Sequence, residues 1–394
     1  MKGAIGGVLV RVGQVASLRV VAIAVAVVQE HALEDVKEHV QIHAMLEVEE
    51  DGNSRLTMKS IKDYKSFQEK KTTKGITFIV TKDCQLACKY CYLVGKNSKE
   101  RLSFGVAKQA IDYILANKEE FDEDSVIWDF IGGEPFLEIE LIDKICDYIK
   151  TELYKKDHHW FNSYRFSFST NGINYHTKKV QDFIMKNRNH LSIGITIDGT
   201  QKKHDLNRIW KTADMEQGKM PSSEEERGSY YDVVKNIPLW LQQFPDGATK
   251  VTISSADIPY IKESVLHLYS LGIHEVNINC VFEDVWREGD DILFEEQLLQ
   301  LADAIIDGGF YKDYACSFFS EHIGKSQDKK LDNQNWCGAG KMLSIDAAGH
   351  FYPCTRFAQY SLRDKKAWVI GNVNEGINKN MLRPFLTLDR CSQS

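Results

Sequence analysis

The stretch CQLACKYC, residues 84–91, places three cysteines at the spacing C-x3-C-x2-C. Thiolates are soft ligands, and a close group of them selects zinc, copper(I) or an iron–sulfur cluster. Structural zinc sites usually pair two C-x2-C or His-containing units, whereas this chain has no second C-x2-C. Three ligands suit a 4Fe–4S cubane better, because one iron is then open to a small molecule. A zinc knuckle or three unrelated cysteines are the ordinary alternatives.

The composition is that of a globular protein. Of the 394 residues, 43% are hydrophobic and 27% are charged, which allows one large domain or two with a substantial core. The net charge of −7 argues against a general nucleic-acid-binding protein. The nine cysteines are an odd number and partly clustered, which indicates metal binding in a reducing compartment rather than a disulfide framework. We therefore expect a cytoplasmic protein.

The first 57 residues differ from the rest of the chain. Their apolar run at 20–28 is too short to span a membrane, so no membrane association is expected. No convincing signal-peptide cleavage site follows it. Because Met58 opens a more ordinary sequence, residues 1–57 are predicted to come either from a mis-assigned start codon or from a small module that binds a leader peptide.

From residue 75 onward, six strand-like runs alternate with six helix-like segments. Apolar, β-rich runs predict strands at 76–80, 126–131, 165–169, 191–197, 250–254 and 276–282. Helical spacing predicts helices at 103–117, 137–153, 176–186, 230–244, 258–271 and 294–307. Such alternation implies a parallel sheet covered by helices, with chemistry in the loops after the strands. The predicted fold is α/β, a partial (β/α)6 TIM-like barrel over residues 70–310.

Distinctive motifs follow the second, third and fourth predicted strands. These are GGEP at 132–135, STNG at 169–172, and TIDG at 196–199 with HDLNR at 204–208. Because the carboxyl ends of parallel strands share one edge, we expect the motifs to form a single site with the cysteine stretch. Each motif also has an ordinary interpretation: a turn with a helix-start carboxylate, a polar turn with a glycine at positive φ, or a surface ion pair.

With Tyr90 before the last cysteine, the C-x3-C-x2-C stretch resembles the radical S-adenosylmethionine (AdoMet) enzymes. In that family three cysteines hold a 4Fe–4S cluster and AdoMet chelates the fourth iron. The reduced cluster cleaves AdoMet to methionine and a 5′-deoxyadenosyl radical, which abstracts a hydrogen atom. The resemblance implies Cys84, Cys88 and Cys91 as cluster ligands. The AdoMet-binding residues that it implies are Tyr90, Gly132, Gly133, Glu134, Pro135, Ser169, Asn171, Thr196 and Arg208.

Two features of the site are left open by the resemblance. Thr196 stands where the family usually has a serine, a mild departure that keeps the hydroxyl. The catalytic residues are not identified, and Asp198 and Asp205 are candidates for lining the substrate pocket.

The C-terminal part carries a second cysteine pattern. Cys337, Gly349 and Cys354 are spaced C-x11-G-x4-C, and a hairpin turn predicted at 346–349 would bring the two cysteines together. The pattern resembles the entrance to a SPASM/twitch auxiliary-cluster domain; two half-buried cysteines are the alternative. Since only Cys391 follows, we expect residues 311–394 to be either a fragment of that domain or a single auxiliary cluster completed by another ligand.

This branch of the family commonly modifies ribosomally made peptides. Residues 75–96 look most like the maturases that install thioether links, which implies a precursor peptide and an electron donor such as flavodoxin or ferredoxin as partners. An anaerobic sulfatase maturase, which forms formylglycine, stays open as an alternative. A non-catalytic iron–sulfur or zinc protein is also open. The GGEP and STNG motifs argue against it, because a structural metal site needs no AdoMet pocket.

Overall fold

The structure is a computed structural model that describes residues 72–93, 98–212, 227–283, 285–320, 338–361 and 365–386. The chain divides into two compact units. The larger unit contains Thr72–Lys250 and Gln327–Ser394, and the other contains Val251–Ser326. The predicted extension 1–57 lies outside the described residues. Within the described ranges, no helix has the length and apolar character needed to cross a membrane.

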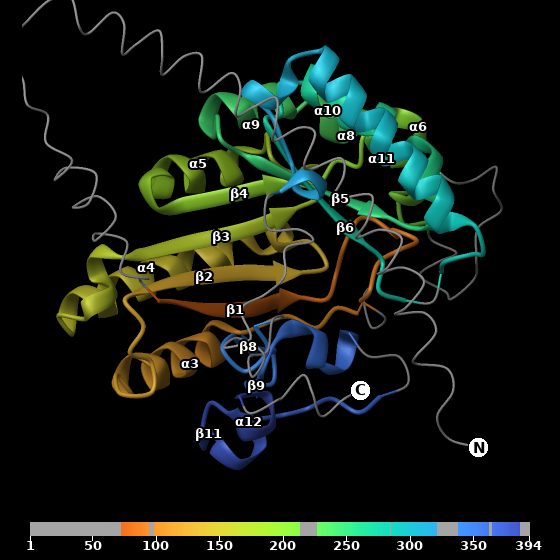
Figure 1. Ribbon diagram of the computed structural model, residues 1–394. Coiled ribbons are helices and arrows are strands. Elements are labelled where there is room, and N and C mark those ends of the chain that lie inside the picture. Colours follow the sequence, from red (N-terminus) through yellow and green to blue (C-terminus); the bar gives the residue numbers. More distant parts are fainter. Residues whose placement is uncertain are drawn as a thin grey trace, which may run out of the picture. The chain divides into compact units, whose positions relative to one another are not determined.

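The larger unit is built on an eight-stranded sheet with helices packed against it (Figure 1). The strand order is β11-β10-β9-β8-β1-β2-β3-β4. Its strands are β1 (Thr73–Thr81), β2 (Ser125–Gly132), β3 (Tyr164–Thr170), β4 (Leu191–Ile195), β8 (Leu343–Ile345), β9 (His350–Tyr352), β10 (Gly371–Asn372) and β11 (Gly376–Ile377). Its helices are α3 (Phe104–Ala116), α4 (Ile139–Lys155), α5 (Lys178–Asn187), α6 (Gln201–Asn207), α8 (Tyr230–Val234), α9 (Ile237–Gln243) and α12 (Lys379–Leu386).

The parallel strands β1 to β4 bury one face in an aromatic layer. Phe78, Trp128, Phe130, Phe166 and Phe168 are all nearly inaccessible to solvent, and neighbouring rings stack along the sheet, with the Phe130 and Phe168 centroids 5.3 Å apart. Successive side chains of a strand point to opposite faces. The alternate positions on β2 and β3 therefore face away from this layer.

The predicted strand–helix alternation is confirmed at all six places. Ser103 begins α3 as predicted, because its side chain accepts a hydrogen bond from the Val106 backbone N–H. The helix predicted at 230–244 is instead two short helices, α8 and α9. Pro238 explains the break, since proline lacks a backbone N–H and collides with the carbonyl four residues earlier.

The C-terminal strands join the sheet of the larger unit rather than forming a sheet of their own. β8 pairs in parallel with β1, with Ile76 opposite Leu343, and β8 and β9 form an antiparallel hairpin. The hairpin turn predicted at 346–349 is confirmed, with Gly349 at a φ of 80°. The domain boundaries at 310 and 311 stay a prediction.

The second unit continues the alternation of strands and helices. A three-stranded sheet has the order β5-β6-β7, and β5 begins in the larger unit, where the hydroxyl of Thr249 donates to the Ile195 carbonyl of β4 at 2.7 Å. The elements are β5 (Ala248–Ile253), α10 (Ile261–Ser270), β6 (Glu275–Cys280), α11 (Asp290–Asp307) and β7 (Ala315–Cys316).

Candidate functional site

The cysteine stretch forms the loop directly after β1. Cys84 is buried, Cys88 and Cys91 are partly buried, and none of the three forms a disulfide. The Leu86 backbone N–H donates to the Cys84 sulfur at 3.4 Å. Among the described residues, no three His, Cys, Asp or Glu side chains are set to hold a single metal ion. A cubane cluster presents a separate iron to each cysteine, so three cysteines on one loop fit such a cluster.

A segment far away in the sequence pairs with the cysteine loop. The backbone N–H groups of Ala87 and Lys89 donate to the carbonyls of Ile209 and Asn207 at 2.9 and 3.0 Å, and the Lys211 N–H donates to the Gln85 carbonyl at 2.9 Å. These antiparallel contacts hold the loop as a strand would be held in a sheet. The sequence predicted that the motif at 204–208 lies near the cysteine stretch, but it did not predict this backbone pairing.

The GGEP motif packs on the root of the cysteine loop. The N–H of Gly133 donates to the Thr81 carbonyl at 2.9 Å, and the N–H of Glu134 donates to the Asp83 carbonyl at 2.8 Å. A Cβ atom at Gly132 or Gly133 would collide with these same carbonyl oxygens. The glycines are therefore needed here for close approach between two loops of the protein.

Glu134 ties the second and third strand ends together. Its buried carboxylate accepts hydrogen bonds from the Thr170 hydroxyl at 2.6 Å and from the backbone N–H groups of Asn171 at 2.7 Å and Phe136 at 3.0 Å. Burial raises the pKa of the carboxyl, and these donors oppose the rise. Pro135 follows in the first turn of a short 3-10 helix, Pro135–Glu138.

The STNG motif sends its side chains in different directions. Asn171 reaches the cysteine loop, where its amide donates to the Gln85 side chain at 3.1 Å and lies 3.9 Å from the Cys84 sulfur. Ser169 instead accepts a hydrogen bond from the Lys250 ammonium at 2.9 Å. The N–H of Thr196 donates to the Thr170 carbonyl at 2.9 Å, which places the fourth strand end beside the third.

A buried polar network links the TIDG and HDLNR motifs to Tyr90. The Tyr90 hydroxyl donates to Asp198 Oδ2 at 2.6 Å and accepts from Arg208 Nη1 at 2.9 Å. Lys203 Nζ lies 3.6 Å from the same Asp198 oxygen, and both side chains are 0% exposed. Burial alone would raise the pKa of Asp198, but the charges of Lys203 and Arg208 hold it below its usual value. Burial raises the pKa of Tyr90 well above its usual value, so its hydroxyl keeps the proton.

Arg208 has one unsatisfied donor. Its side chain is 6% exposed, and its Nε is buried without a hydrogen-bond partner in the described part of the chain. A buried, unpaired donor costs about 1–3 kcal/mol, and such groups commonly meet a ligand that completes them. The guanidinium lies near enough to Glu134 and to Cys88 to influence their charges or be influenced by them.

His204 supports this network as a neutral side chain. The N–H of Asp198 donates to His204 Nδ1 at 3.2 Å, which leaves the proton on Nε2, 3.0 Å from the Ser229 hydroxyl. Burial lowers the pKa of His204 to about 3.

This lowered pKa predicts a pH effect on stability. The unfolded chain takes up a proton on this histidine near its usual pKa of 6.5, whereas the folded chain does so only near 3. The free energy of unfolding therefore falls as pH drops through this window. Chemical denaturation at several pH values should show a smaller fall for His204→Asn than for wild type; equal pH slopes would contradict this account.

Asp205 is one of the two predicted substrate-pocket carboxylates, and its side chain binds a backbone N–H group of the protein. Its side chain accepts a hydrogen bond from the Tyr230 N–H at 2.9 Å, and a Cβ atom at Gly228 would collide with it. Asp198 is enclosed by the network described above. The placement of either carboxylate at a substrate pocket stays a prediction.

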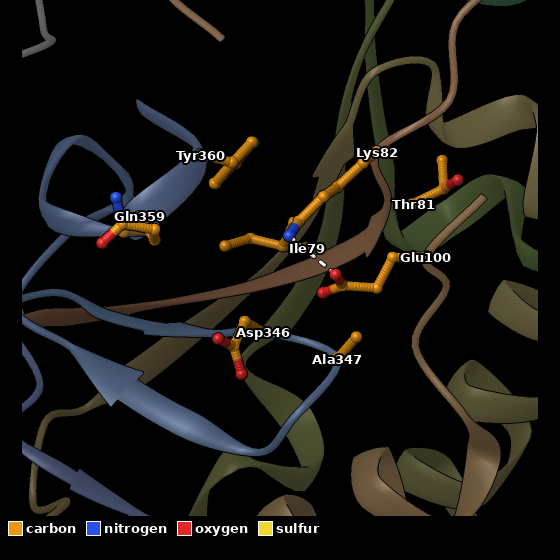
Figure 2. Close-up of a pocket in the computed structure, with 9 residues that line it drawn as sticks. Ile79, Thr81, Lys82, Glu100, Asp346, Ala347, Gln359 and Tyr360 are labelled. Atoms are coloured by element: carbon orange, nitrogen blue, oxygen red, sulfur yellow. Dashed lines mark hydrogen bonds and ion pairs between the residues drawn. The ribbon is translucent and has the colours of Figure 1, made fainter. Parts of the chain in front are cut away.

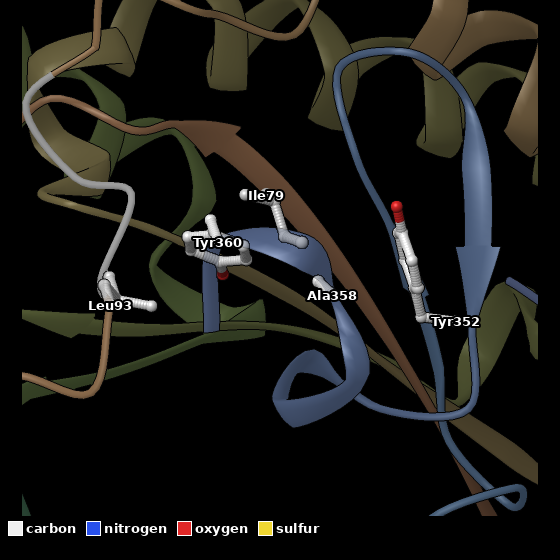
Figure 3. Packing of buried hydrophobic residues seen from close by; sticks show 5 residues of the cluster. All are labelled: Ile79, Leu93, Tyr352, Ala358 and Tyr360. Atoms are coloured by element: carbon white, nitrogen blue, oxygen red, sulfur yellow. The ribbon is translucent and has the colours of Figure 1, made fainter. Parts of the chain in front are cut away.

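The C-terminal segment covers another side of the cysteine loop. Leu93, just beyond Cys91, packs in a buried cluster with Ile79, Tyr352, Ala358 and Tyr360 (Figure 3). The Arg356 guanidinium lies 4.7 Å from the ring centroid of Tyr92. Cys354 is buried beside Ala339 and Phe385. Of the other predicted auxiliary ligands, Cys337 and Cys391 lie outside the described residues.

A cavity at this junction is too small for a cofactor. Figure 2 shows it between the end of β1, the 346–347 turn and the segment at 358–360, with Lys82 and Glu100 paired at 2.8 Å on one side. Its volume of about 20 Å³ suits a single water molecule.

Asp129 is a candidate residue that the sequence analysis passed over inside an apolar run. It stands between Trp128 and Phe130 on β2, so it points to the face opposite the aromatic layer. It is opposite Ser167 on β3, whose hydrogen bond lowers its pKa while burial raises it more. A single carboxylate within an otherwise apolar strand is the sequence feature that could have identified Asp129.

Comparisons with known proteins agree with the motifs. A family model described as a 4Fe–4S single cluster domain matches residues 73–215. The uncharacterized protein MJ0907 of Methanocaldococcus jannaschii is 26% identical over 305 residues, which cover 77% of this chain and 89% of that protein.

Two solved structures share the fold. Native anSMEcpe with bound AdoMet and Cp18Cys peptide matches with a TM-score of 0.59 at 15% identity, covering 82% of this chain and 86% of that one. Streptococcus suis SuiB bound to the precursor peptide SuiA matches with a TM-score of 0.52 at 13% identity, covering 92% of this chain and 80% of that one. The predicted partial barrel and the predicted resemblance are confirmed at the level of the fold: this chain shares the fold of these two structures, and its cysteine loop lies within the region that matches the 4Fe–4S single cluster domain.

Proposed function

We propose that this protein is a radical AdoMet maturase that modifies a ribosomally made peptide. The observation that carries the proposal is the convergence of three strand-end motifs on one loop that presents three cysteines. Glu134, Asn171 and Arg208 each reach that loop or its neighbours through hydrogen bonds. A structural metal site would not need this surrounding set of buried polar groups.

The residues present fit a 4Fe–4S cluster with AdoMet. Cys84, Cys88 and Cys91 would hold three irons, which leaves the fourth open. When bound, the pair supplies one-electron cleavage of AdoMet and hydrogen-atom abstraction from the substrate. Arg208 would use its unpaired Nε to bind the anionic end of AdoMet, because a guanidinium pairs well with a carboxylate.

Four of the other predicted AdoMet contacts would act by holding the cysteine loop in place. Gly132, Gly133 and Glu134 fix the second strand end against the root of the cysteine loop. Asn171 would orient the loop through Gln85. These residues hold the site in shape before a ligand arrives, which lowers the entropic cost of binding.

The test is AdoMet cleavage by anaerobically reconstituted protein. After reduction with dithionite, we expect wild-type protein to convert AdoMet to 5′-deoxyadenosine. Protein that is fully loaded with iron and sulfide but forms none would contradict the proposal and favour the non-catalytic iron–sulfur alternative.

The reaction proposed for the substrate is thioether formation. One C–S bond forms while one S–H and one C–H bond break. One hydrogen atom leaves in 5′-deoxyadenosine and the other leaves as a proton, so one electron must return to an iron–sulfur centre. The similarity to SuiB bound to a precursor peptide supports a peptide substrate. Flavodoxin or ferredoxin as the electron donor stays a prediction.

Formylglycine formation is the second candidate. Its support is the similarity to anSMEcpe, whose structure holds AdoMet and the Cp18Cys peptide. The two reactions differ in the fate of sulfur, which a thioether product keeps and a formylglycine made from cysteine loses. Co-expression with the small Cys-containing peptide encoded nearest this gene, followed by mass spectrometry, separates them.

Asp129 and Lys250 would contact the peptide. Asp129 lies on the face of the sheet opposite the aromatic layer, beside Ser167, and Lys250 of β5 donates to Ser169. Together these side chains offer both an acceptor and a donor, as the amides of an extended peptide require. Asp129→Asn is expected to raise the KM for the modified peptide about tenfold without a matching fall in kcat. An unchanged KM would remove Asp129 from the peptide site.

A further inference from the structure

Tyr90 lies between Cys88 and Cys91, and both hydrogen-bonding functions of its hydroxyl are used. It donates to Asp198 at 2.6 Å and accepts from Arg208 at 2.9 Å. A hydroxyl bonded in two directions fixes the position of its ring far better than packing alone does. Because Tyr90 directly precedes Cys91, the position of the ring also fixes the path of the loop there.

Asp198 is held in place independently of the loop. Lys203 lies 3.6 Å from its Oδ2 inside a region with 0% exposure for both side chains. Its backbone N–H donates to His204 Nδ1, and the hydroxyl of Ser229, which contacts His204 Nε2, donates to the Arg208 carbonyl at 2.8 Å. Asp198 and Arg208 are thus parts of one rigid frame around α6.

We infer that Asp198 is a positioning residue that acts through Tyr90 on the cluster-binding loop and on the AdoMet-facing side of Arg208. This role is distinct from contact with the substrate, which stays a prediction for Asp198. It rests on the proposed function, because it concerns where the cysteine loop and Arg208 stand when AdoMet binds.

Loss of the Tyr90 hydroxyl is expected to change the orientation of the Arg208 guanidinium more than the retention of the cluster. Without the Tyr90 hydroxyl, Arg208 Nη1 loses an acceptor and Asp198 loses a donor. The guanidinium would then turn toward Asp198, since a buried charge seeks its nearest partner. That rotation would take Nε away from the ligand, while the three cysteines would still be present to hold the cluster.

The variants Tyr90→Phe and Asp198→Asn and their double variant test this role. We expect each single variant to contain as much iron and sulfide as wild type and to bind AdoMet about tenfold more weakly. The change that AdoMet causes in the electron paramagnetic resonance spectrum of the reduced cluster should differ from that of wild type. The double variant should be no weaker than the weaker single variant, because both changes break one chain of contacts.

Tyr113 provides a matched control. Its hydroxyl donates to Glu120 at 2.6 Å and accepts from the Ile377 N–H at 2.9 Å, the same distances as at Tyr90, but on α3. Tyr113→Phe should leave both AdoMet affinity and the spectrum as in wild type.

Two results would overturn the inference: Tyr90→Phe matching the Tyr113→Phe control, or effects of Tyr90→Phe and Asp198→Asn that simply add. Should Asp198→Asn fail to fold, the comparison of Tyr90→Phe with Tyr113→Phe decides alone. Failure of the proposed function would look different, because wild-type protein with a full cluster would then show no spectral response to AdoMet.

Discussion

Replacing Cys84, Cys88 and Cys91 together with alanine is expected to abolish both cluster binding and AdoMet cleavage. The three thiols lie on the loop that the GGEP, STNG and TIDG motifs surround, and a cubane without cysteine ligands is not retained. After anaerobic reconstitution, iron and sulfide should fall to trace levels, and 5′-deoxyadenosine should fall to the level of a protein-free control.

Cys280→Ala is the matched control for this loss. Cys280 is a free, partly buried thiol on β6, and burial raises its pKa to about 11, so it stays a thiol at neutral pH. This variant should keep its iron and its activity. A triple variant that retained a full cluster would show that other residues bind it.

Lys203→Met is expected to lower the free energy of unfolding by about 3 kcal/mol. Lys203 and Asp198 are both 0% exposed, and removing Lys203 takes away the largest of the positive charges that compensate the buried Asp198. Urea denaturation of the cluster-loaded protein measures the effect as a lower midpoint.

The surface pair Lys178–Asp182 supplies the comparison for this prediction. Its atoms are closer, at 2.6 Å, but its side chains are 85% and 50% exposed. Lys178→Met should therefore cost no more than about 0.5 kcal/mol. Equal effects of the two substitutions would mean that Asp198 does not depend on Lys203.

Structural features that depend on residues close together in the sequence were predicted correctly. The apolar runs and helix caps predicted the six strand–helix units. The C-x3-C-x2-C spacing identified the loop after β1 as the candidate cluster site. The hairpin ending at Gly349 was also predictable, because its turn chemistry lies within a few residues.

Contacts between distant segments were not predictable in the same way. The pairing of 85–89 with 207–211 joins segments about 120 residues apart, and neither segment has a strand pattern of its own. The parallel pairing of β8 with β1 is equally non-local. Asp129 was not singled out because it lies inside the apolar run 126–131, which predicted only a strand.

The GGEP motif shows how one pattern can have a second, structural reason. Gly132 and Gly133 are predicted to bind AdoMet, and the structure adds that they lie against the carbonyls of Thr81 and Asp83. Because they lack a side chain, the end of β2 can pack directly against the start of the cysteine loop. The glycines thereby contribute to the site by positioning its thiols.

The most direct test of the central claim is electron–nuclear double resonance on the dithionite-reduced protein with isotopically labelled AdoMet. If Cys84, Cys88 and Cys91 hold a 4Fe–4S cluster with one open iron, labels in the amino and carboxylate groups of AdoMet should couple to the cluster spin. Coupling in wild type and in Cys280→Ala is the predicted result. A fully loaded, reduced cluster that shows no coupling to bound AdoMet would contradict the account.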